Sequence, residues 1–167
     1  EQQANPPCAI KRTFMSAQFL LPPLARPAES FTAYFIRMLQ GSFDMQEAKT
    51  AVKGPYADHY RNLAVQVLGS QNRAIEAFSF LEDIQDNPLK MDCFEKLAPS
   101  LVQQDAFQLL LKGFQILKGA RLSLCQYTAA VRYLELRNLA RAVNLYFVNA
   151  SEIHKKRLFE LIYENAA

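Results

Sequence analysis

One stretch of the chain, residues 120–148, limits the fold more than any other. Its apolar side chains point in nearly every direction around a helix axis and do not form a single stripe. A helix that is apolar on all sides is normally buried on all sides. Without a break it would be about 45 Å long at 1.5 Å per residue, which is long for a domain of this size. We therefore predict a central buried helix with a kink or break near Arg137 and Asn138.

The remainder of the chain also reads as helices and contains no convincing strand. Apolar residues recur at helical spacing in segments separated by Gly, Pro and Ser, with short connections that favour antiparallel neighbours. No fixed internal period is evident. We predict an all-α, single-domain bundle over residues 1–167, with about eight helices around the central one and an extended N-terminal segment at residues 1–8. Besides 120–148, the expected helices are 9–21, 28–40, 44–52, 55–68, 71–85 capped by Ser70, 90–97 ending before Pro99, a helix opened by a capping box at Ser100, and 152–165.

Composition excludes several classes of protein. Half of the 167 residues are apolar and 21% are charged, which argues against intrinsic disorder. No apolar run approaches the roughly 18 residues of a membrane-spanning helix. The net charge is only +3, and although residues 112–157 hold nine bases against two acids, these bases fall on different sides of their helices. We therefore expect neither a membrane span nor nucleic-acid binding.

The cysteines leave the cellular compartment open. Cys8, Cys93 and Cys125 are too widely spaced for a structural zinc site. The chain begins at Glu1 without a methionine, so either a targeting segment has been removed or the sequence has been trimmed. Removal would favour a secreted or periplasmic location, with one disulfide in any of three pairings. The alternative is three reduced thiols, since free cysteine packs like a small hydrophobe. We expect the extracytoplasmic location.

Residues with catalytic potential are few. His59 follows Asp58, but adjacent residues of a helix do not face each other, so Asp58 cannot orient His59 as a triad acid does. His154 reads as solvated, and the paired carboxylates Glu82 and Asp83 are expected to face water. A cysteine could meet His59 in space, but Cys125 lies in an apolar helix that disfavours a thiolate. Phosphate-binding loops, nucleophile elbows and zinc-protease motifs are absent. We predict no enzyme, and no catalytic, cofactor-binding or metal-binding residue.

Aromatic residues and one sequon complete the candidates. The chain has 12 Phe and 7 Tyr but no Trp. At helical spacing these rings favour a core, although they could also line a cavity for an apolar ligand. Asn149-Ala150-Ser151 is an N-glycosylation sequon, but Asn149 is expected to end one helix and Ser151 to cap the next.

The predicted function is protein binding. Missing catalytic groups and abundant apolar helix surface favour a non-enzymatic interaction module, such as an adaptor, scaffold or regulatory binding protein, that meets another protein through an apolar helical surface. The alternative is a carrier that holds a small apolar ligand, such as a lipid, between its helices.

Overall fold

The computed structural model describes residues 29–167, with side chains from residue 33 onward. Within these residues the chain forms nine α-helices and no strand, so the all-α prediction is confirmed for the described part. None of these helices is long and apolar enough to cross a membrane. The helices are α2 (Glu29–Leu39), α3 (Met45–Ala51), α4 (Ala57–Ser70), α5 (Ala74–Glu82), α6 (Asn87–Gln103), α7 (Phe107–Phe114), α8 (Gly119–Glu135), α9 (Leu139–Val148) and α10 (Glu152–Ala166).

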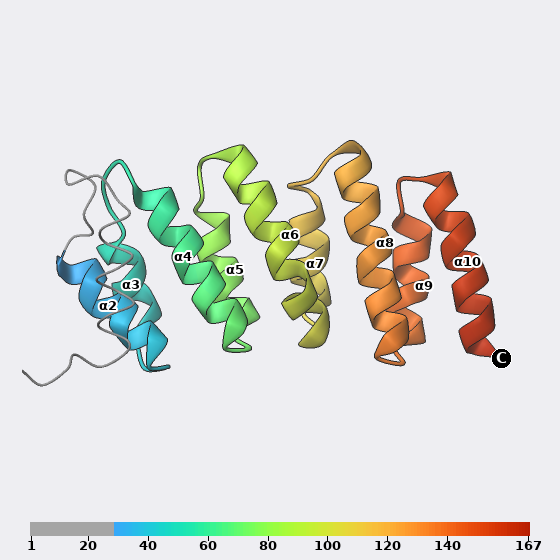
Figure 1. The fold of residues 1–167 in the computed structure, drawn as a ribbon, viewed down its shortest axis with the longest axis horizontal. Helices are drawn as coiled ribbons and strands as arrows, with labels where there is room; N and C mark the ends of the chain where they lie inside the picture. The colour runs from blue at the N-terminus through green and yellow to red at the C-terminus, as the bar shows by residue number, and fades with distance from the viewer. Residues whose placement is uncertain (1–28) are drawn as a thin grey trace, which may run out of the picture.

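The helices stack as a row of hairpins and do not surround a central element (Figure 1). The hairpins are α2–α3, α4–α5, α6–α7 and α8–α9, followed by α10. The first helices of successive hairpins, together with α10, contact one another in chain order and form one layer, which we call the first-helix layer. Helices α5, α7 and α9 lie behind it in Figure 1. Stacked helix pairs of this kind make an elongated α-solenoid, in which each unit contacts mainly its neighbours.

The same turn joins the two helices of each hairpin. One residue in the left-handed region follows the first helix, and the next residue donates a backbone hydrogen bond to a carbonyl five positions earlier, which is the Schellman motif. These bonds are 2.8–2.9 Å long. The left-handed residues recur at intervals of 31, 33 and 32 positions: Gly41, Asn72, Asp105 and Arg137. The backbone therefore has a regular period that the side-chain pattern did not reveal.

The expected central helix is not one helix and is not central. The break near Arg137 and Asn138 is confirmed: Arg137 has φ 62°, and the Asn138 side chain accepts the Arg141 N–H at 3.2 Å to cap α9. The two halves, α8 and α9, form the fourth hairpin of the row. Leu124 is 55% exposed and Phe147 is 69% exposed. Apolar residues pointed in all directions because each half buries a different face.

Other helix boundaries also differ from expectation, most clearly at Pro99 and Ser70. Helix α6 runs through Pro99 to Gln103, so Ser100 lies inside a helix and opens no capping box. Ser70 ends α4, with its hydroxyl donating to the Val67 carbonyl at 2.7 Å, and therefore does not cap the following helix. The expectations for residues 1–8 and 9–21, and any pairing of Cys8, lie outside the described residues.

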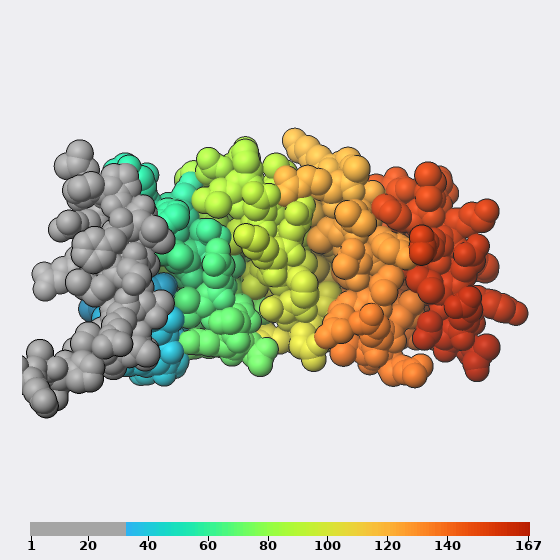
Figure 2. Space-filling view, viewed as in Figure 1, coloured from blue at the N-terminus to red at the C-terminus, as the bar shows by residue number. Residues whose placement is uncertain are grey.

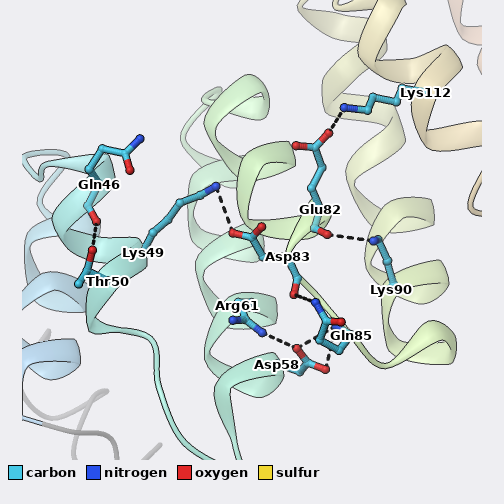
Figure 3. Close-up of polar contacts among 10 residues, drawn as sticks. All are labelled: Gln46, Lys49, Thr50, Asp58, Arg61, Glu82, Asp83, Gln85, Lys90 and Lys112. Carbon is cyan, nitrogen blue, oxygen red and sulfur yellow. Dashed lines mark hydrogen bonds and ion pairs between the residues drawn. The ribbon is translucent and has the colours of Figure 1, made fainter.

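Polar links join neighbouring hairpins along the row. The Gln71 side chain donates to the Met38 carbonyl at 2.7 Å, and Gln104 accepts the Ala74 N–H at 3.1 Å. Both glutamines directly precede a left-handed turn residue. Figure 3 shows a second set of links that involves Glu82 and Asp83. Lys49 pairs with Asp83 at 3.1 Å, and Lys112 pairs with Glu82. These carboxylates, expected to face water, thus tie α5 to α3 and α7 at the surface.

Candidate functional site

The residues considered for catalysis have structural roles or stand apart. His59 is exposed on α4. Its neighbour Asp58 accepts the backbone N–H of Gln85 at 3.0 Å, and the Arg61 guanidinium donates to it at 2.8 Å (Figure 3). Asp58 also accepts the backbone N–H of Asp86 at 2.8 Å. Burial raises the pKa of Asp58, but these hydrogen bonds outweigh burial and hold it below its usual value. Asp58 therefore anchors the turn before α6.

Both described cysteines are free thiols with low reactivity. Cys93 is 2% exposed on α6, and Cys125 is half-buried on α8. Burial raises the pKa of each thiol to about 11, so both are protonated at neutral pH. His59 is not among the residues that line the groove beside Cys93. Residues 29–167 also contain no cluster of three or more His, Cys, Asp or Glu side chains that could hold a metal ion.

The sequon residue Asn149 belongs to a helix junction. Its side chain is buried, with the residue only 4% exposed, and its Nδ2 donates to the Ser123 carbonyl at 3.1 Å. Its Oδ1 accepts the Ser151 N–H at 2.8 Å, and Ser151 caps α10 by accepting the His154 N–H. The glycan-accepting nitrogen is therefore already used inside the fold. His154, expected to be solvated, is half-buried and stacks on Tyr127 with 5.0 Å between ring centroids.

A groove between α6 and α8 gathers exposed apolar atoms on the first-helix layer. Its volume is about 250 Å³. The walls are apolar or small: Ala98, Pro99 and Val102 from α6, and Leu124, Cys125 and Ala129 from α8. The first-helix layer faces the reader in Figure 2, where α6 and α8 lie near the middle of the row. Ala98 and Ala129 contribute small, buried side chains to the groove, whereas Leu124 lies at its edge with more than half of its surface exposed to solvent.

Pro99 leaves one backbone carbonyl of α6 without its usual helical hydrogen bond. Proline has no N–H, so the Glu95 carbonyl one turn earlier lacks its usual helical donor. Both residues line the groove.

Ion pairs border the groove. Arg121 donates to Glu95 at 2.6 Å and to Asp92 at 2.7 Å. Further along α8, Arg132 pairs with Glu135 at 2.7 Å and donates to Gln103 at 3.3 Å. These contacts hold charged side chains beside an apolar channel. Arg121 and Arg132 are two of the nine bases in residues 112–157. Three more of these bases form ion pairs elsewhere: Lys112, Arg141 and Lys155.

Two other grooves lie on the same layer. The groove between α4 and α6 is lined by polar groups such as Asn62, Gln66 and Lys96. The groove between α8 and α10 includes Glu135, Arg137 and Asn165. Among these, the α6–α8 groove has the most apolar walls. Its residues escaped sequence analysis because they come from two helices, and because Pro99 reads as a helix stop.

Comparison with protein-family models, with curated proteins and with solved structures gave no significant match.

Proposed function

We propose that the protein is a non-enzymatic interaction module that binds a segment of another protein in the α6–α8 groove. The observation that supports this proposal is an open apolar channel, bordered by ion pairs, on two packed helices. Binding hot spots are typically apolar anchors inserted into such pockets and surrounded by a polar rim. The anchor would be an apolar side chain of the partner.

The size of the groove favours a side chain over a lipid. Pockets that enclose a small ligand typically have volumes of about 300–1,000 Å³ and cover most of the ligand surface. The α6–α8 groove is smaller, at about 250 Å³, and open to solvent. For this groove, a carrier of apolar ligands is therefore the weaker proposal. For catalysis, the described cysteine thiols are protonated and His59 is exposed, so these residues supply no activated nucleophile.

Peptide selection tests the proposal directly. A random peptide library is selected against the immobilised full chain, and enriched peptides are synthesised and titrated by fluorescence anisotropy. We expect the enriched peptides to share an apolar anchor. Leu124→Glu places a carboxylate at the groove edge and should weaken binding about tenfold or more, since burying an unpaired charge is costly. Ile75→Glu is the matched control, because Ile75 is 61% exposed on α5, outside the groove.

Two outcomes would count against groove binding. One is a selection that enriches no sequence, and the other is a set of peptides that bind the Leu124→Glu variant as tightly as the wild type. Native mass spectrometry of the protein from its natural source tests the alternative of a lipid carrier, for which we expect one co-purifying lipid per chain.

A further inference from the structure

Helix α10 exposes several large apolar side chains. Ile153 is 81% exposed, Phe159 58% and Tyr163 71%. At the neighbouring end of α9, Phe147 is 69% exposed. Tyr146 joins these groups, with ring centroids 5.2 Å from Phe147 and 6.3 Å from Phe159. We call Phe147, Ile153, Phe159 and Tyr163 the α10 patch; the helix that carries most of it lies at the red end of the row in Figure 1.

The two aromatic residues of α10 occupy positions that are buried in earlier first helices. Phe159 lies eight residues after its helix cap Ser151, and Tyr163 lies twelve after it. The position eight residues after the cap holds Phe94 in α6 and Gln126 in α8, which are 0% and 5% exposed. The position twelve residues after the cap holds Ala98 and Ala130, which are 5% and 0% exposed.

In α6 the second helix of the hairpin helps to bury the first of these two positions. Phe94 meets Phe114 of α7 edge to face, with 6.0 Å between ring centroids. Within residues 29–167 no second helix follows α10. Phe159 of the α10 patch therefore occupies the position against which a second helix packs in α6.

The charges of α10 indicate which helix fits. Lys156 and Arg157 lie in its first half, and Glu160 and Glu164 in its second half, all exposed. None of these four takes part in the ion pairs of the described residues, whereas Lys155 pairs with Glu152 in its own helix. When two copies of α10 lie antiparallel, the bases of each face the acids of the other, while a parallel arrangement opposes like charges. The surface is thus complementary to itself under a two-fold axis.

We propose that a second copy of this chain binds the α10 patch, with the two α10 helices packed antiparallel across a two-fold axis. The aromatic residues of each copy then cover those of the other. This interface is separate from the α6–α8 groove, which stays open in each copy.

Sedimentation equilibrium of the full chain tests the dimer, over about 1–200 µM because self-association follows mass action. We expect a concentration-dependent dimer for the wild type. Phe159→Glu combined with Tyr163→Glu should weaken dimerisation about a hundredfold, and circular dichroism checks that the variant remains folded. Ile75→Glu, at a comparably exposed apolar site on α5, should leave the dimer unchanged. A wild type that is monomeric throughout, or a dimer indifferent to the double substitution, would overturn the proposal.

Charge reversal tests the antiparallel arrangement. Lys156→Glu with Arg157→Glu makes the face acidic, and Glu160→Lys with Glu164→Lys makes it basic. Each variant alone should dimerise about tenfold more weakly, because like charges then face each other. An equimolar mixture should form heterodimers as tight as the wild-type dimer at low salt. Failure of the mixture to associate better than either variant alone would refute the two-fold pairing of α10.

Discussion

The contact between Gly113 and Phe94 offers the most direct test of the packing between α6 and α7. A Cβ atom at position 113 would lie 2.5 Å from Phe94 Cζ and 2.6 Å from Cδ2, closer than the 3.0 Å below which real Cβ atoms essentially never come. Phe94 is completely buried and meets Phe114 edge to face, so its ring has no free space to enter. Gly113→Ala must therefore shift the ring or separate the two helices.

Two opposing effects set the magnitude. Overpacking a core costs about 1–3 kcal/mol, and several ring atoms of a buried side chain place this case at the upper end. Replacing a helical glycine by alanine returns about 1 kcal/mol of helix propensity. We expect a net loss of about 2 kcal/mol. For a chain of this length, that loss lowers the melting temperature by about 4–8 °C. Urea unfolding, followed by both circular dichroism and tyrosine fluorescence, measures the change in the free energy of unfolding.

A second helical glycine provides the matched control. A Cβ atom at Gly69 in α4 would meet only the Leu97 Cδ1 atom, at 3.3 Å. Gly69→Ala should therefore change stability by less than about 0.5 kcal/mol, because the clash and the propensity gain nearly cancel. Adding Phe94→Leu to Gly113→Ala should cost less than the sum of the two single changes, because the smaller side chain relieves the overlap. A Gly113→Ala variant as stable as the wild type would refute this account of the contact.

Three further predictions follow from individual side chains. Asp58→Asn should lose about 1 kcal/mol at pH 7, since charged acceptors form the stronger hydrogen bonds. Because folding lowers the pKa of Asp58, the stabilisation by its carboxylate is present above the unfolded-state pKa of about 3.9 and is lost as the pH falls through the folded-state pKa. Equal urea midpoints of the wild type and Asp58→Asn at pH 7 would contradict this prediction. Arg137→Gly should raise the melting temperature by about 1–3 °C, because Arg137 has φ 62° and glycine adopts this conformation without strain; a lower melting temperature would argue against strain there. Iodoacetamide should label Cys125 about a hundredfold more slowly in the native than in the urea-unfolded protein at pH 7.5, because its pKa is raised to about 11. Peptide mapping by mass spectrometry measures both rates, and similar rates would show that the groove does not shield this thiol.

Features that depend on near neighbours in the chain could be predicted from the sequence. The helical spacing of apolar residues identified all-α structure, and the break near Arg137 and Asn138 follows from a helix too long for the domain. The sequence likewise predicts that Asn149 ends one helix and Ser151 caps the next, and the structure confirms both. Helix formation and capping involve residues within about one turn of each other, so a local pattern is sufficient.

Features that depend on which helices meet required the tertiary structure. Pro99 reads as a helix stop, yet α6 continues through it and uses it to line a groove with α8. A glycine inside a helix normally weakens it, whereas the missing side chain of Gly113 is what lets Phe94 approach. The candidate groove depends on Ala98 and Ala129, which different hairpins place side by side. Local spacing shows which face of a helix is apolar, but the stacking of whole hairpins decides which part of that face stays open to solvent.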